Sequence, residues 1–321
     1  MKLTKNVKKL KGDASTRIFY RKKEKKTTSI IVYSNKDKKS NLLNYDSINQ
    51  ILLKNKILAP VLLSKNYKEN FIEIQDFGNQ TIFDILKKRK TNKIKIFKQI
   101  VDLLENLQSI KQKKITNFNN REYTVPTYKP KILEDEAKLF SEWYIEKKIK
   151  KLNQKRFKKS YYKVIKNLVK KINLKNDTFV HRDFHISNLM MVENKIGIID
   201  SQDALIGNKA YDLASLIDDV RFKTSEELKN KIFKKFVKLN SSIDQYKLKN
   251  DFEILSVLRN LKIIGIFTRL AVRDKKTRYM KMIPYAWNII EKRTSKNLIF
   301  KDLKLKLNKY FSKKLRLKKW K

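Results

Sequence analysis

The chain has 321 residues, a formal net charge of +46 and no cysteine. This length suffices for one large domain or for two lobes with a sizeable core, and the lack of cysteine excludes disulfides and thiolate metal sites. Only two histidines are present, which leaves little scope for a zinc site.

The N-terminal stretch 1–9 is basic and has no apolar segment, so it does not resemble a secretory signal. No stretch reaches the apolar length of a membrane span. We therefore predict a cytoplasmic protein without a membrane span. Lysine is spread over almost every segment, asparagine and isoleucine are abundant, and glycine and proline are scarce. This pattern indicates coding bias with lysine at solvated positions, so no specific nucleic-acid partner is expected.

Residues 11–34 predict a turn of small polar residues, 12–16, between two strands, with a second turn before the β-branched strand 27–33. A loop of small residues can place backbone N–H groups against phosphates. Residues 44–58 predict a helix, which ends before Pro60. Short strands are expected around 61–63 and 71–74.

Asp76-Phe77-Gly78 ends the strand 71–74, and a helix begins at Thr81. This junction is compatible with the hinge of a two-lobed kinase, where backbone groups meet adenine, and equally with an ordinary strand-to-helix turn.

The rest of the chain is mainly helical in pattern. Helices are expected from residue 94 onward, near 132–151, from Asp212, over 253–273 and over 296–321. Trp143 lies beside the apolar stripe of the second of these helices. Core packing is the favoured interpretation of its aromatic residues, and stacking on a sugar ring is the alternative. The last helix is basic and amphipathic, and we expect it to dock on the core with a solvated lysine face.

The stretch 179–190 contains both histidines of the chain. Within it, His181-Arg182-Asp183 and Asn188 fit the spacing H-R-D-x-x-x-x-N of a kinase catalytic loop. Asp200 follows twelve residues later, at the end of an apolar run. In phosphoryl transfer, the first Asp accepts the proton of the attacking hydroxyl, and the Asn and the second Asp hold the metal ion. A polar turn between two strands is the less favoured alternative.

Only twelve residues separate Asp200 from Asp212. An activation segment like that of protein kinases does not fit in this space. The spacing therefore favours a small-molecule acceptor over a protein substrate.

Together these motifs resemble the aminoglycoside phosphotransferase and choline kinase-like superfamily. Within it, they are most similar to the bacterial N-acetylmuramate/N-acetylglucosamine anomeric kinases of cell-wall recycling. The stretches that carry the resemblance are 12–17, 181–190, 199–204 and 265–274. The resemblance implies an α+β, protein kinase-like, two-lobed fold. Residues 1–77 would form a small nucleotide-binding lobe with an antiparallel sheet and a helix, and residues 78–321 a larger, mainly helical lobe with the catalytic loop, the metal site and the acceptor pocket.

The resemblance also implies ATP and Mg²⁺, with catalytic roles for Asp183, Arg182 and His181. Asn188 and Asp200 would bind the metal. The residues implied for the nucleotide are Gly12, Ser15, Thr16, Arg17, Glu73, Gln75 and Phe77. The residues expected near the acceptor are His185, Gln202, Asp203, Trp143 and Arg269. Many members of the superfamily carry a Lys on the third strand of the small lobe, where this chain has residues 30–33, Ile-Ile-Val-Tyr. Arg17 or a nearby Lys would have to supply that charge.

The favoured hypothesis is a monomeric kinase that phosphorylates the anomeric hydroxyl of an N-acetyl amino sugar. One alternative is an aminoglycoside- or choline-type phosphotransferase, which the scarcity of carboxylates outside the catalytic stretch disfavours. A non-catalytic, basic, nucleic-acid-binding protein is the more distant alternative. It is disfavoured because Asp183 and Asp200 are both present.

Overall fold

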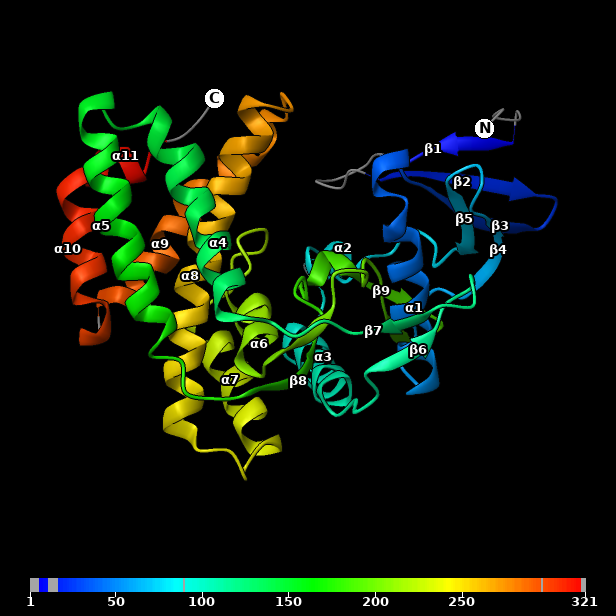
Figure 1. The fold of residues 1–321 in the computed structure, drawn as a ribbon. Coiled ribbons are helices and arrows are strands. Elements are labelled where there is room, and N and C mark those ends of the chain that lie inside the picture. The colour runs from blue at the N-terminus through cyan, green and yellow to red at the C-terminus, as the bar shows by residue number, and fades with distance from the viewer. Residues whose placement is uncertain (1–5, 11–16, 89, 296, 319–321) are drawn as a thin grey trace. The chain divides into compact units, whose positions relative to one another are not determined.

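The computed structural model describes residues 6–10, 17–88, 90–295 and 297–318 (Figure 1). The chain forms two compact units. Unit 1 consists of Met1–Thr127 with Asp177–Ile206, and unit 2 of Tyr128–Asn176 with Gly207–Lys321. The segment predicted to be the catalytic loop therefore belongs to the same unit as the N-terminal sheet. The predicted lobe boundary at residues 77 and 78 concerns the lobes around a nucleotide, and it stays a prediction.

Unit 1 is built on a five-stranded antiparallel sheet of order β1-β2-β3-β5-β4. The strands are β1 (Val7–Lys9), β2 (Ile18–Glu24), β3 (Thr27–Tyr33), β4 (Leu62–Asn66) and β5 (Phe71–Gln75). Alternate residues of β3 and β5, such as Val32 and its partner Ile72, share a core with Tyr45 of helix α1 (Ser40–Lys54). The alternation of a half-buried strand places these side chains on one face.

Helix α1 differs from the predicted helix 44–58, because it begins four residues earlier and ends at Lys54. The amide of Asn55 still bonds to the carbonyl of Ile51, but Lys56 has a φ of 60°. A left-handed residue cannot continue the helix, so the chain leaves it well before Pro60.

The remaining elements of unit 1 follow the sheet in sequence. Thr81 caps α2, accepting a hydrogen bond from the amide of Asp84, as the sequence predicts for a helix that begins there. The loop before Pro126 contains a hairpin that the sequence analysis missed, β6 paired with β7. These elements are α2 (Ile82–Leu86), α3 (Lys93–Gln108), β6 (Lys114–Thr116), β7 (Glu122–Thr124), β9 (Leu189–Val192) and β10 (Lys195–Ile198). Strand β8 (Asn176–Val180) pairs with β11 (Leu205–Asn208).

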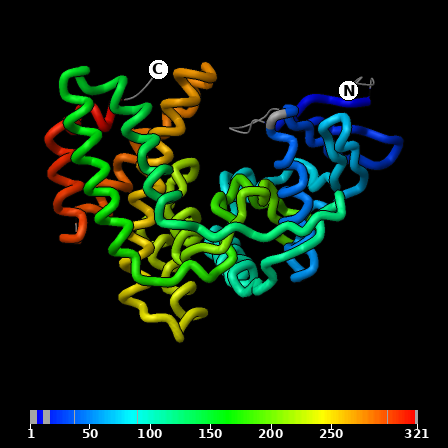
Figure 2. Tube along the Cα trace, viewed as in Figure 1, coloured from blue at the N-terminus to red at the C-terminus, as the bar shows by residue number. Residues whose placement is uncertain are grey.

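Unit 2 is helical in its described part (Figure 2). Its α-helices are α4 (Pro130–Leu139), α5 (Lys151–Val169), α6 (Ala210–Ile217), α7 (Glu226–Leu239), α8 (Gln245–Val272), α9 (Ile283–Ser295), α10 (Lys301–Tyr310) and α11 (Lys313–Arg316). Its core is rich in aromatic rings, and Phe140 contacts Tyr144, Tyr161, Trp287 and Phe311. The predicted preference for core packing of this aromatic stripe agrees with these contacts.

Two predicted helices of unit 2 are interrupted. In place of the helix expected over 132–151, α4 ends at Leu139. A π-helical turn (Phe140–Tyr144) and a 3₁₀ turn (Ile145–Lys147) follow it. The helix expected over 296–321 breaks after Tyr310, and the Ser312 side chain caps α11. No helix in the described residues is long and apolar enough to cross a membrane. The predicted α+β fold class is confirmed, with an antiparallel sheet and helix in unit 1 and a helical unit 2.

Candidate functional site

The β9–β10 hairpin positions the two predicted metal ligands. Its two-residue turn, Glu193-Asn194, has φ values of 47° and 63°, which is typical of a type I′ turn. Such a turn matches the twist of the strands that it joins. Asn188 immediately precedes β9, and Asp200 lies two residues beyond the end of β10. The hairpin thus brings the two ends of the predicted motif together.

The backbone of Ile199 connects the catalytic-loop stretch to the segment that holds Asp200. Its amide donates to the carbonyl of Asn188 over 3.0 Å. Its carbonyl oxygen lies 3.1 Å from Nε2 of His181, which must carry the proton because a carbonyl can only accept. Both polar groups of one residue therefore hold the loop and the Asp200 segment in register.

His181 is fully buried, and its ring packs edge-on against Phe184. Burial lowers the pKa of His181, although the charges of Asp183 and Asp200 act in the opposite direction. The neutral imidazole is consequently favoured at neutral pH. These surroundings suit a residue that orients the loop better than one that exchanges protons with a substrate.

Two residues of the candidate site have left-handed backbone conformations. The φ value is 72° at Arg182 and 65° at Asp200. Such conformations are uncommon for residues other than glycine, and they concentrate where function determines the backbone. One of them, Arg182, directly precedes Asp183, and the other is the predicted metal ligand Asp200 itself.

Asp183 and Asn188 are joined through the backbone of the loop. The side-chain amide nitrogen of Asn188 donates to the carbonyl of Asp183 over 3.0 Å. The amide oxygen of Asn188 is then the atom suited to a cation. The Asp183 side chain is itself half-buried.

The donor set fits Mg²⁺ bound together with phosphate oxygens. Among the residues that the structure describes, no three His, Cys, Asp or Glu side chains form a self-sufficient metal cage. Mg²⁺ usually takes one or two carboxylates and completes its shell with water and substrate phosphates. The amide oxygen of Asn188 and the carboxylate of Asp200, whose side chain is 33% exposed, match this pattern.

Arg17 contacts the predicted metal ligand directly. Its guanidinium forms an ion pair with Asp200 and donates to Oε1 of Gln202 over 2.6 Å. Its side chain is only 4% exposed, and the rings of Phe19 and Tyr45 flank it. Burial raises the pKa of Tyr45 to about 12, which Arg17 opposes and Asp200 supports. Arg17, rather than a lysine on β3, therefore supplies positive charge next to Asp200.

The segment after Asp200 is tied to helix α1 by a contact that the sequence analysis missed. The hydroxyl of Ser201 donates to the side-chain oxygen of Asn49 over 2.6 Å, and Asn49 also donates to the carbonyl of Pro60. One Asn in a helix carries no signal of such a role. The Gln202 side chain in turn donates to Asp203 over 2.7 Å, so both predicted acceptor residues lie close to Arg17 along the chain of contacts.

The predicted hinge packs against the β9–β10 hairpin. Phe77 is buried, and a Cβ built on Gly197 of β10 would lie 2.7 Å from its ring. Arg21 of β2 also contacts the hinge segment. It forms an ion pair with Asp76 and donates a hydrogen bond to the carbonyl of Gly78 over 2.8 Å. Arg21 was also missed. The sequence does contain a pattern that points to Arg21, since the alternation of β2 places it on the same face as Phe19.

Glu73, predicted to contact the nucleotide, is held within the sheet by its neighbours, and its role at the nucleotide stays a prediction. Ser29 donates to its carboxylate over 2.5 Å, and Lys22 lies 3.3 Å away. Burial favours the protonated form, but the hydrogen bonds from Ser29 and Lys22 outweigh it and lower the pKa of Glu73. Gln75 lies on the same face of β5, two residues further.

The remaining predicted residues belong to several parts of the chain. Gly12, Ser15 and Thr16 lie outside the described residues. His185 is buried beside Asn188, with 3.5 Å between its Nε2 and the Asn188 amide nitrogen. Trp143 and Arg269 belong to unit 2, on the π-helical turn and on α8.

Comparison with known proteins agrees with this geometry. The sequence profile of the phosphotransferase enzyme family matches residues 6–236, more than half of the chain. The chain belongs to this family. Two relatives named N-acetylmuramate/N-acetylglucosamine kinase are similar to this phosphotransferase. The one from Neisseria meningitidis is 25% identical over 88% of this chain and 83% of its own length. The one from Pseudomonas aeruginosa is 28% identical over 73% of this chain and 68% of its own length.

Solved structures show the same fold. An ADP-bound aminoglycoside phosphotransferase aligns with a TM-score of 0.58 and 14% identity, covering 89% of this chain and 92% of its own. The choline kinase LicA from Streptococcus pneumoniae aligns with a TM-score of 0.57 and 15% identity, covering 89% and 91%. The predicted superfamily and kinase-like fold are thus confirmed. The chain is a phosphotransferase enzyme, as predicted, and the roles of the individual site residues stay predictions.

Proposed function

We propose that this phosphotransferase moves the γ-phosphate of ATP onto the anomeric hydroxyl of an N-acetyl amino sugar, with N-acetylmuramate and N-acetylglucosamine as the candidate acceptors. The names of the relatives from Neisseria meningitidis and Pseudomonas aeruginosa support this class of acceptor. The single structural observation that supports phosphoryl transfer at this site is the double hydrogen bonding of Ile199, which links the segments that carry Asp183, Asn188 and Asp200.

In this proposal, Asp183 orients the acceptor hydroxyl and takes its proton as the oxygen attacks the γ-phosphate. Asn188 and Asp200 would hold Mg²⁺, which when bound neutralises charge on the triphosphate. Arg17 takes the place of the lysine that many superfamily members carry on β3, because its buried guanidinium already lies against Asp200. Positioning and electrostatics supply most of the rate in such reactions. A cytoplasmic monomer is part of the same proposal.

The proposal is tested by incubating the protein with ATP, Mg²⁺ and either amino sugar, and by examining the product with phosphorus NMR. A sugar 1-phosphate that is lost in mild acid is expected. A 6-phosphate would contradict the proposed position of attack. Phosphorylation of choline or an aminoglycoside, without any sugar product, would favour the alternative acceptors.

Three variants separate the roles. Asp183→Asn is expected to abolish most turnover and to leave ATP binding nearly unchanged, because the base acts on the acceptor. Asp200→Ala should weaken Mg²⁺-dependent ATP binding as well. Glu193→Gln, at the exposed turn of the same hairpin, is the matched control and should keep full activity. Normal turnover in Asp183→Asn would refute its assignment as the base.

A further inference from the structure

A continuous groove runs along unit 2 between α5 and α10, two helices that lie side by side (Figure 1). Its larger part has a volume of about 480 Å³ and its smaller part about 260 Å³. Val164 and Asp302 line both parts, so the two parts join. Arg156 and Tyr310 lie at one end of the groove, and Lys171 and Ile299 at the other.

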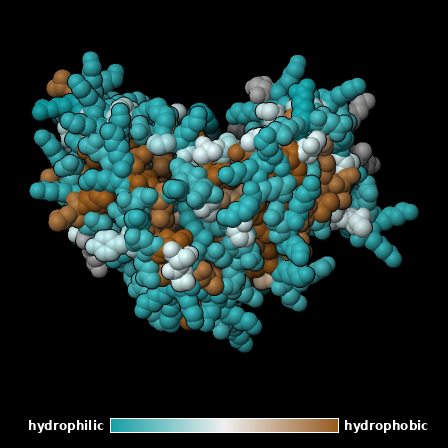
Figure 3. Space-filling view, turned by 60° about the horizontal axis from the view of Figure 1, so that its bottom comes forward, coloured by the Kyte–Doolittle hydropathy of each residue, from teal (hydrophilic) through white to brown (hydrophobic). Residues whose placement is uncertain are grey.

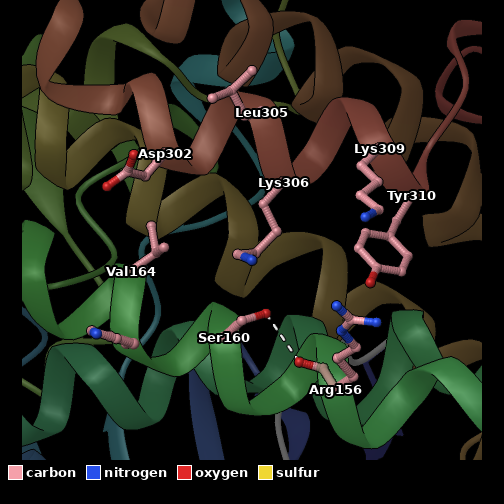
Figure 4. A pocket seen from close by; sticks show the side chains of 9 residues that line it. Arg156, Ser160, Val164, Asp302, Leu305, Lys306, Lys309 and Tyr310 are labelled. Carbon is pink, nitrogen blue, oxygen red and sulfur yellow. Dashed lines mark hydrogen bonds between the residues drawn. The ribbon is translucent and has the colours of Figure 1, made fainter.

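The lining of this groove is strongly basic. Its charged residues are the cations Arg156, Lys163, Lys170, Lys171, Lys306 and Lys309 and one acid, Asp302. In Figure 4, Lys306 and Tyr310 point from α10 toward α5, Arg156 points back toward Tyr310, and Asp302 lies at the far side from Arg156. Within the described part of the chain, none of these six cations forms an ion pair with a carboxylate. By contrast, Lys158 of α5 pairs with Glu146.

This local charge exceeds the average for the chain. Helices α5 and α10 together contain eleven Lys and Arg residues and one acid, a net charge of +10 over 29 residues. That is about one net charge per three residues, against one per seven for the whole chain, which has +46 over 321 residues. This concentration of charge cannot be recognised from the even spread of lysine along the sequence, because the two helices are far apart in the chain. Uncompensated cations along one groove repel one another, and a polyanion would relieve that repulsion.

We propose that the α5–α10 groove binds single-stranded nucleic acid through its phosphate backbone. The span from Arg156 to Lys171 is 15 residues, roughly 22 Å at the rise of an α-helix. A single strand laid along this length would present several phosphates to the cations of the groove. Tyr310, at the end of the groove, provides an aromatic ring of the kind on which a base stacks.

The shape of the site favours a strand over a lipid surface. A membrane meets protruding apolar side chains, and Leu305, 60% exposed, is the one large exposed apolar side chain among the described lining residues. The face of the molecule drawn in Figure 3 is mainly polar, with smaller apolar patches. A recess between two helices with cations on both walls suits a linear polymer.

The test measures fluorescence anisotropy of labelled 12-nucleotide oligouridylate and oligothymidylate from 50 to 300 mM KCl. The groove variant carries Lys163→Ala, Lys306→Ala and Lys309→Ala. Loss of three phosphate contacts should lower the slope of log K against log salt by roughly 2, since each contact with a single strand contributes about 0.7. Sugar-kinase activity should stay unchanged, because these residues are not part of the candidate catalytic site.

The matched control carries Lys234→Ala, Lys238→Ala and Lys249→Ala, which are exposed helical lysines of unit 2 that form no ion pair within the described residues. It has the same net charge as the groove variant, and its slope should change by less than 0.7. Equal slopes for the two variants would overturn the proposal, because binding would then follow diffuse charge alone. Groove-dependent binding to phosphatidylglycerol vesicles or to polyglutamate, without binding to either oligonucleotide, would also overturn it.

Crosslinking provides a test that needs no variant. A 12-nucleotide strand that contains 4-thiouridine is irradiated on the unmodified protein, and the adducts are located by mass spectrometry. Adducts on Tyr310 and its neighbours along α5 and α10 are expected. Adducts confined to other segments would refute the assignment of the groove.

Discussion

Gly197→Ala tests the contact between the β9–β10 hairpin and the predicted hinge. A Cβ at this position would lie 2.7 Å from Cε2 of Phe77 and 3.3 Å from a methyl group of Leu58. Ordinary contact begins near 3.4 Å, so the Phe77 ring would have to move by about 0.7 Å or more. The ring is buried, so its displacement would disturb the packing around it.

The size of the effect follows from packing. Overpacking a core costs typically ~1–3 kcal/mol, and replacing a strand glycine with alanine returns about 0.5–1 kcal/mol through the unfolded chain. A net loss of roughly 1–2 kcal/mol should lower the melting temperature by about 1.5–3 °C, because unfolding a chain of 321 residues carries an entropy of about 0.7 kcal/mol/K. If Phe77 lies at the nucleotide, the KM for ATP should rise more than kcat falls.

The assay combines thermal unfolding with initial rates at varied ATP. Phe77→Leu removes the ring atoms that clash, so the double variant should be more stable than the sum of the two single losses predicts. Strictly additive losses, or an unchanged melting temperature in Gly197→Ala, would refute the packing argument. A stability loss with an unchanged KM would refute only the role of Phe77 at the nucleotide.

Three further predictions concern single positions. Gly265→Ala would place a Cβ 2.2 Å from the backbone carbon of Leu139, where no side chain can yield, so urea unfolding should show a larger loss than for Gly197→Ala, about 3 kcal/mol or more. Lowering the pH from 7 to 5 should destabilise the protein more than its His181→Gln variant. Burial lowers the pKa of His181, so the unfolded chain takes up the proton first, near pH 6.5, and stability falls as pH decreases; parallel pH profiles would contradict this. Arg17→Met should lower kcat/KM for ATP roughly 10- to 100-fold, the equivalent of one charged hydrogen bond, with partial recovery in Arg17→Lys; unchanged rates would exclude Arg17 from nucleotide binding.

Local patterns predicted the parts of the site that lie close together in sequence. The motif 181–188 and the strand that ends before Asp200 were identified because their spacing is a property of one hairpin. Thr81 as the start of a helix was likewise a local signal. The local structure around such a motif is therefore accessible from the sequence, while the chemical roles of its residues stay predictions.

Contacts between distant segments could not be predicted in the same way. Arg17 and Gln202 are 185 residues apart, and the side chain of Arg17 could be matched with Asp200 only after the sheet and the hairpin had been placed. The prediction of helix ends was wrong for a related reason. The predicted helix 132–151 is interrupted where Gly265 of α8 approaches the backbone of Leu139 and Phe140, and no periodicity within 132–151 records that neighbour.

The hydrogen bonds around Ile199 account both for the left-handed backbone of the site and for the role of His181. Left-handed residues such as Arg182 and Asp200 cost of order 1–3 kcal/mol each, and they persist only where the surroundings over-determine them. Here Ile199, between the hairpin and Asp200, is held by Asn188 on its amide and by His181 on its carbonyl. A buried, neutral His181 can donate to that carbonyl permanently, whereas an exposed one would exchange with water. We infer that His181 acts by positioning the loop, and that only Asp183 exchanges a proton with the acceptor.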